Sequence, residues 1–148
     1  MSTPPFRYTT KVAARQTVSE LIDFLAGNGA KHVLISYDER TQRPCGLRFM
    51  LPRNGVDLSI KLPVNPEAVR RKLVGYGLKG KMASPEHAER VAWRQTLEYV
   101  RAAYAFIWTG QKEPAAIFLA DLYNENRGAT FFELEQRPGG QLALPPPQ

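Results

Sequence analysis

Apolar residues at helical spacing predict one long helix in the second half of the chain. Between residues 93 and 108 they recur at steps of three, four or one, which places them on one continuous face. Ser84-Pro85 supplies residue types that favour a helix start, and Gly110 supplies the type that favours a helix end. The pattern therefore predicts a helix over residues 85–109, about 37 Å long at 1.5 Å per residue. Its buried face is predicted to carry Trp93, Leu97, Val100, Tyr104, Ile107 and Trp108, and another face carries Arg90, Arg94, Glu98 and Arg101.

Three shorter helices are predicted from similar signals. The first spans residues 18–26, because Thr17 and Glu20 have the spacing of a capping box and glycines follow the apolar positions. The second begins at Asn65-Pro66, where proline occupies the first helical position. The last begins at Pro114, and its buried face is predicted to carry Ala115, Phe118, Leu119 and Leu122.

Alternation of apolar and polar residues predicts three strands, over residues 32–37, 46–51 and 56–62. Asn54-Gly55 joins the last two strands as a hairpin, because both residues tolerate the positive φ angles of a type I′ turn. Residues 130–135 are predicted as an optional edge strand, with Glu133 and Glu135 on one face. The third strand is predicted to bury Val56, Leu58, Ile60 and Leu62 and to expose Asp57, Ser59 and Lys61.

These elements predict an α+β fold in which a three-stranded antiparallel sheet follows an N-terminal helix and precedes a short, a long and a C-terminal helix. The 148 residues suit one domain. We expect an extended N-terminal arm (1–16), a single α+β domain (17–136) and a flexible Pro/Gly-rich tail (137–148). Because three strands cannot cover the whole long helix, part of its apolar face is predicted to be exposed and to form a homodimer.

Composition and charge narrow the function classes. The single cysteine, Cys45, excludes an internal disulfide and suits a reducing compartment. The first residues lack the apolar region of a secretory signal, and no apolar run is long enough to cross a bilayer, so a cytoplasmic protein without a membrane partner is expected. The net charge of +6 and the pI of about 9.7 favour a polyanionic partner.

The sequence predicts no enzyme, no metal site and no cofactor. Residues 75–80 match the letters of the dinucleotide-binding fingerprint, but a helix and not a strand precedes them. A hinge and a phosphate-contacting loop therefore remain as interpretations of this segment. Cys45 has no histidine or cysteine at metal-ligand spacing, although a cysteine–histidine pair formed in space stays open. His87 lies in the first turn of the long helix, where the helix dipole disfavours its protonation.

Residues 67–81, called here the basic segment, are the strongest functional lead. Five cations and one acid give this segment a net charge of +4, and Tyr76 among them has a ring that can stack on a base. Arg48 and Lys61 are predicted to project from the solvent face of neighbouring strands and to extend the same basic surface. A merely solvated charged face has equal weight as an interpretation. The predicted nucleic-acid-binding residues are Arg48, Lys61, Arg70, Arg71, Lys72, Tyr76, Lys79 and Lys81.

Three groups of residues carry a resemblance to a known family. Trp93-Arg94 opens an apolar helix, Gly110 ends it, and Phe118-Leu119-Ala120 follows. In this spacing the chain resembles an uncharacterised family of small proteins encoded by tailed phages and prophages, over roughly residues 17–122. The chain departs from the family pattern at residues 112–115, where the family has an acidic stretch. The resemblance implies a phage protein acting in a bacterial host cell, and it supplies no catalytic residues.

The expected function is therefore that of a non-enzymatic phage accessory protein that binds nucleic acid. DNA is favoured, as single strands or without sequence preference, because no helix-turn-helix recognition helix is present in the pattern. The alternative is a protein-binding factor that inhibits or redirects a bacterial host enzyme or defence system. A third interpretation is a virion or assembly component.

Overall fold

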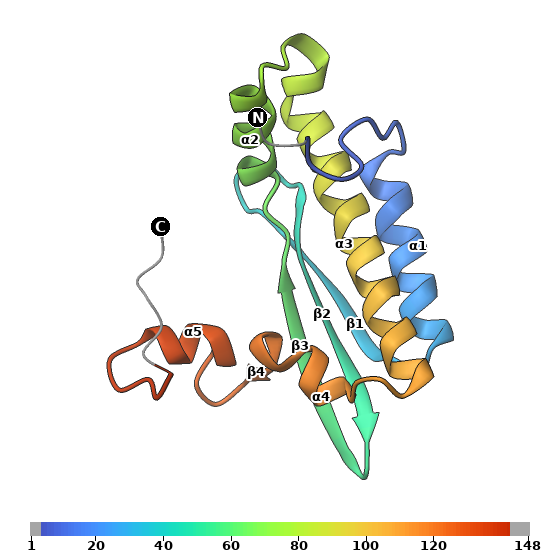
Figure 1. The fold of residues 1–148 in the computed structure, drawn as a ribbon, viewed down its shortest axis with the longest axis vertical. Helices are drawn as coiled ribbons and strands as arrows, with labels where there is room; N and C mark the ends of the chain where they lie inside the picture. Colours follow the sequence, from blue (N-terminus) through green and yellow to red (C-terminus); the bar gives the residue numbers. More distant parts are fainter. Residues whose placement is uncertain (1–3, 143–148) are drawn as a thin grey trace.

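A three-stranded antiparallel sheet with two long helices against one face forms the body of the protein (Figure 1). The computed structural model describes residues 4–142. Their elements, in chain order, are α1 (Ala14–Gly27), β1 (Lys31–Tyr37), β2 (Pro44–Arg53), β3 (Val56–Pro63), α2 (Pro66–Tyr76), the 3₁₀ turn η1 (Gly80–Ala83), α3 (Pro85–Thr109), α4 (Pro114–Ile117), the 3₁₀ turn η2 (Leu119–Asp121), β4 (Tyr123–Asn124), β5 (Ala129–Thr130) and α5 (Phe131–Gln136). The predicted α+β class and the order of its main elements are confirmed.

The sheet has the order β1-β2-β3, and its core-facing side chains come in register from neighbouring strands. Phe49 pairs with Ile60, and both side chains are fully buried. The predicted hairpin is confirmed, because Asn54 and Gly55 have φ angles of 49° and 80°. The prediction that Val56 faces the core is wrong: its side chain is 65% exposed, since the hairpin tip extends past the ends of the helices (Figure 1).

Helix α3 has the bounds that the sequence predicted, and local interactions hold both ends. The Ser84 hydroxyl accepts a hydrogen bond from the His87 backbone N–H, which is the capping contact expected at a helix start. Gly110 ends the helix in the left-handed conformation with φ of 80°. The middle of the helix supplies Trp93, Leu97 and Val100 to the core, all fully buried.

Trp108, in the last turn of α3, lies outside the core, which corrects its prediction as a buried residue. Helices α1 and α3 lie side by side and run in the same direction (Figure 1). Phe24 near the end of α1 contacts Tyr104, with the two ring centroids 5.3 Å apart. Because α1 ends at Gly27, the next turn of α3 has no neighbouring helix, and Trp108 is 88% exposed.

The start of α1 differs from the prediction in both position and chemistry. The helix begins at Ala14, and Thr17 is a buried residue of its first turns rather than its cap. The Thr17 hydroxyl and the Glu20 carboxylate both accept hydrogen bonds from the Arg94 guanidinium. Arg94, predicted on a different face of α3 from the apolar residues, is buried, because this contact draws it between α1 and α3.

The chain before α1 forms two turns that contact α3. The Tyr8 N–H donates to the Pro5 carbonyl and the Thr10 N–H donates to the Arg7 carbonyl. The first three residues of the predicted arm lie outside the described residues, as do residues 143–148 of the predicted tail.

The C-terminal third corrects two further predictions. The helix that begins at Pro114 ends at Ile117, and Leu119, predicted to be buried, is 48% exposed. The strand predicted over residues 130–135 is wrong beyond its first residue, because α5 occupies 131–136. Thr130 and Glu133 form a capping box at the start of α5, so Glu133 caps a helix and does not line a strand.

Candidate nucleic-acid interface

The basic segment folds as α2 without its first residue, a turn and the start of η1, at the end of the molecule where α3 begins (Figure 1). Asn65 starts α2 by accepting a hydrogen bond from the Ala68 N–H, and Leu73 anchors the helix with a fully buried side chain. Gly77 ends α2 with φ of 108°. Gly75 lies within this helix, so residues 75–80 have neither the strand nor the following helix start of a dinucleotide-binding loop. The structure thus excludes the fingerprint interpretation and places a helix end and a turn there.

Burial of Leu73, with Val69 partly buried against the core, turns the opposite face of α2 outward. Arg71, Lys72 and Tyr76 are exposed on this helix, and Lys79 and Lys81 are exposed in the turn and in η1. The Tyr76 side chain is 39% exposed. An aromatic ring and four cations therefore meet solvent along one continuous stretch of chain.

Arg70 differs from the other cations of the segment because a carboxylate neutralises it. Its Nε and Nη2 donate to the two carboxylate oxygens of Glu67 at 2.9 and 2.8 Å. This bidentate pair lowers the pKa of Glu67 and keeps the carboxylate charged. Within residues 4–142 the other four cations, Arg71, Lys72, Lys79 and Lys81, form no ion pair.

Arg48 and Lys61 face away from the helices, as predicted, and the C-terminal part of the chain contacts both of them. They are register partners on β2 and β3. The Arg48 guanidinium lies 4.4 Å and the Lys61 ammonium 5.1 Å from the ring centroid of Tyr123. Arg48 also pairs with Glu125. These two cations are engaged by the chain around β4, on a different part of the molecule from the basic segment.

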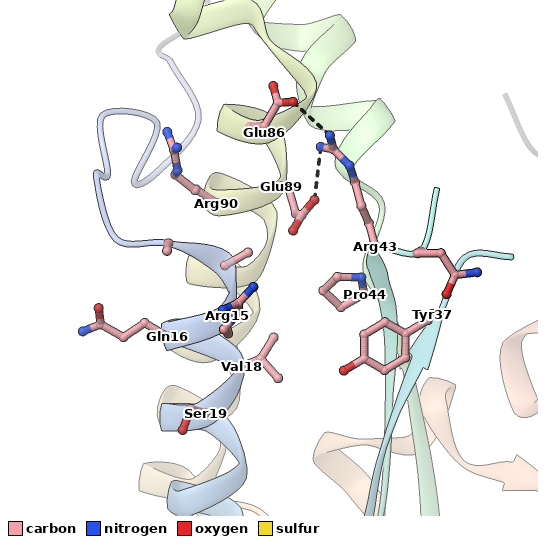
Figure 2. A pocket seen from close by; sticks show the side chains of 13 residues that line it. Arg15, Gln16, Val18, Ser19, Tyr37, Arg43, Pro44, Glu86, Glu89 and Arg90 are labelled. Atoms are coloured by element: carbon pink, nitrogen blue, oxygen red, sulfur yellow. Dashed lines mark hydrogen bonds and ion pairs between the residues drawn. The ribbon is translucent and has the colours of Figure 1, made fainter. Parts of the chain in front are cut away.

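Sequence reasoning missed an ion-pair network beside the start of α3, which Figure 2 shows. Arg43, in the loop before β2, donates from Nη2 to Glu86 at 2.9 Å and from Nη1 to Glu89 at 3.3 Å. The network borders a cleft of about 800 Å³ between the start of α1 and the end of β1, into which the Tyr37 ring points. Burial raises the pKa of Glu89, and Arg43 opposes that effect. The partners are too far apart in sequence for any local pattern to indicate them.

The remaining candidate groups serve packing. His87 is buried, and its Nε2–H donates to the Tyr8 carbonyl at 2.5 Å, which holds the N-terminal turns against α3. Cys45 is half-buried at the start of β2 and forms no disulfide. No three His, Cys, Asp or Glu side chains of residues 4–142 are grouped to hold a metal ion. None of the helices in this part of the chain has both the length and the apolar character to cross a bilayer.

Comparisons of the chain with protein-family models, with curated proteins and with solved structures found no match. The resemblance to the phage family therefore stays a prediction.

Proposed function

We propose that the protein binds nucleic acid without sequence preference through the exposed face of the basic segment. The observation that carries the proposal is a set of four cations, Arg71, Lys72, Lys79 and Lys81, that form no ion pair within residues 4–142 and lie in the same segment as the exposed ring of Tyr76. Cations that contact phosphates release condensed counterions, and this release supplies most of the affinity in sequence-independent binding. Arg48, Lys61 and Arg70 have a smaller role in this proposal, because Glu125, Tyr123 and Glu67 already engage them.

Single strands are the favoured substrate, and DNA is the favoured chemical class. Tyr76 lies one helical turn from Lys72, so a base stacked on the ring has its phosphate near a cation. A duplex keeps its bases stacked internally and offers only phosphates to the same surface. We place this activity in a phage accessory protein within a bacterial cell, following the resemblance.

The proposal is tested by fluorescence anisotropy with a labelled single-stranded oligonucleotide at low salt. The four-cation variant changes Arg71, Lys72, Lys79 and Lys81 to alanine, and we expect it to bind at least about tenfold more weakly. A matched control changes four other exposed cations without ion pairs in the described part of the chain, namely Lys11, Arg15, Lys112 and Arg127. Both variants fall from a net charge of +6 to +2, so only the position of the charge differs. Equal loss in both variants would contradict the proposed site.

The stacking role of Tyr76 is tested by comparing single-stranded with double-stranded DNA. Tyr76→Leu is expected to lose about 1 kcal/mol of affinity for the single strand, because one base loses its stacking partner. Its affinity for the duplex is expected to stay unchanged. Tyr37→Leu is the control, since Tyr37 is more exposed (58%) and lies outside the segment. An equal loss of affinity for single-stranded and double-stranded DNA would contradict base stacking on Tyr76.

The exposed end of α3 favours a second candidate function, binding of a host protein. Trp108 is 88% exposed and Phe106 is 43% exposed, and both lie in the last turn of α3. Tryptophan is enriched among the residues that dominate protein interfaces. If Trp108 binds a host protein, one host protein co-purifies with the wild type and with the four-cation variant but not with Trp108→Gln.

The homodimer proposed through this helix predicts instead a concentration-dependent dimer in sedimentation, which Trp108→Gln abolishes.

A further inference from the structure

A second cleft, which no residue of the basic segment lines, lies between α3, the end of β3 and η2. It has a volume of about 360 Å³. Leu62 and Ala92 provide apolar surface, and the polar lining comes from Gln95, Thr96, Tyr99 and Asp121. The cleft thus combines an apolar wall with several oxygen atoms, and Asp121 provides its only carboxylate.

Asp121 is unusual among the acidic residues of the protein. All fourteen lie within residues 4–142, where the others that are shielded from solvent have a hydrogen-bond or ion-pair partner. Asp121 is half-buried and has no such side-chain partner among the described residues. Burial without a partner raises the pKa of this carboxyl, because desolvation disfavours the charged form. A bound cation would offset the desolvation of the Asp121 carboxylate, and a carboxylate in such surroundings is a candidate binding group.

Two neighbouring polar groups each donate to a backbone carbonyl and keep an oxygen acceptor for a ligand. Gln95 donates an amide hydrogen to the Phe6 carbonyl at 2.7 Å, so its side-chain oxygen remains an acceptor. Thr96 donates its hydroxyl hydrogen to the Ala92 carbonyl at 2.8 Å and keeps lone pairs on the same oxygen. Together with the Asp121 carboxylate, these oxygens match a ligand that has only donors.

Tyr99 adds an aromatic face to the same cleft. Its side chain is 48% exposed, and an edge contact with Phe118 at 6.5 Å between centroids holds the ring. Burial and the charge of Asp121 both raise the pKa of Tyr99, which indicates that the carboxylate acts on the tyrosine hydroxyl. A cation beside this carboxylate also gains from the electron-rich face of the ring.

We propose that the cleft lined by Asp121, Tyr99, Gln95 and Thr96 binds a primary ammonium group on an alkyl stem. An ammonium is compact and has three donors and no acceptor, which fits an acceptor lining with one carboxylate. The apolar wall at Leu62 and Ala92 suits the methylene groups of the stem. The same chemistry occurs in a lysine side chain and in a free alkylamine, and the experiment separates these two sources.

The test is a titration of ¹⁵N-labelled protein, followed by the amide resonances of residues 95–99 and 121. The probes are n-butylammonium chloride, n-butanol as its neutral analogue, and Nα-acetyl-lysine methylamide. We expect the ammonium probes to shift these resonances and butanol to leave them in place. Tighter binding of the lysine derivative identifies a peptide as the source, and equal or weaker binding identifies a free amine. Shifts with butanol equal to those with butylammonium, or no shift with either ammonium probe, would overturn the proposal.

Asp121→Asn is the decisive variant, with Asp23→Asn as its control because Asp23 is an exposed carboxylate without a partner in the described chain. We expect about tenfold or greater loss of butylammonium affinity in Asp121→Asn and no loss in the control. Because desolvation disfavours the Asp121 charge, the asparagine variant is expected to fold with at least wild-type stability at neutral pH. As a second readout, the pKa of Asp121 followed by ¹³C NMR should fall when butylammonium is present. Unchanged affinity in Asp121→Asn would contradict the proposed site.

Discussion

Arg94 is the residue that connects α1 most directly to α3. Its Nη1 donates to Glu20 at 2.9 Å and its Nη2 donates to Thr17 at 3.0 Å. Thr17 is fully buried and Arg94 is 9% exposed, so the contact lies between the helices and not on their surface. Glu20 keeps about a third of its side chain in contact with water, at 34% exposure. The contact holds α1 against α3, because it gives the buried Thr17 hydroxyl a hydrogen-bond partner.

We predict that Arg94→Met lowers the free energy of unfolding by about 2 kcal/mol, because the Thr17 hydroxyl loses its partner inside the core. Arg101→Met on the same helix is the control, since Arg101 is exposed and should change stability by less than about 0.5 kcal/mol. Urea unfolding monitored by circular dichroism measures both. An effect of Arg94→Met no larger than that of the control would show that the pair is not structural.

The same variant has a predicted pH dependence. The hydrogen bond from Arg94 lowers the pKa of Glu20 below its ordinary value of 4.5. A group with a lowered pKa in the folded state stabilises the fold above its unfolded pKa, and that contribution is lost as the pH falls through the folded value. The stability difference between wild type and Arg94→Met should therefore be largest at neutral pH and shrink below pH 4.5. A difference that stays constant across this range would contradict the ion pair.

Two threonines show why one local pattern leads to two structures. Thr17 and Thr130 are each followed by a glutamate three positions later. At Thr130 the pattern forms a capping box, whereas at Thr17 both side chains turn to Arg94, 74 or more residues away in sequence. The pattern indicates hydrogen-bonding capacity, and the tertiary partner decides how that capacity is used. This is why the sequence predicted a cap at the wrong threonine and a strand where α5 forms.

At the level of the element, local signals define both ends of α3. We predict that Ser84→Ala lowers the free energy of unfolding by about 1 kcal/mol, because the His87 N–H loses its acceptor. Ser19→Ala is the matched control on an exposed position of α1, and it should have little effect. Urea unfolding again gives the comparison, and equal effects of the two substitutions would show that the cap does not contribute.

The helix predicted from Pro114 shows the limit of such signals. Apolar residues at helical spacing continue to Leu122, but the helix stops at Ile117. Phe118 is drawn into the core, where its ring contacts Phe49 with centroids 5.8 Å apart. Leu122 forms a bridge with Ile60 on the open edge of β3, which requires an extended backbone. These contacts with residues about 60 positions earlier overrule the local pattern, and the sequence alone does not contain them.

Over the whole molecule, the pairing of charges determines which cations remain available. Half of the fourteen acidic side chains pair with arginines, as at Arg43, Arg48, Arg53 and Arg94. The basic segment contains one acid, and Arg70 neutralises it. The sequence could predict this segment because its cations are contiguous. It could not show that Arg48 and Lys61 contact Tyr123, or that Asp121 lines a cleft with Tyr99, because those partners come together only in the folded chain.

The salt dependence of DNA binding tests the central claim most directly. The measurement is the association constant of the wild-type protein for a single-stranded oligonucleotide across a range of salt concentrations. Four cations that each contact a phosphate predict a slope of about −3 in a plot of log K against log salt. The four-cation variant should give a slope near zero. A wild-type slope near zero, or an unchanged slope in the variant, would contradict binding through the basic segment.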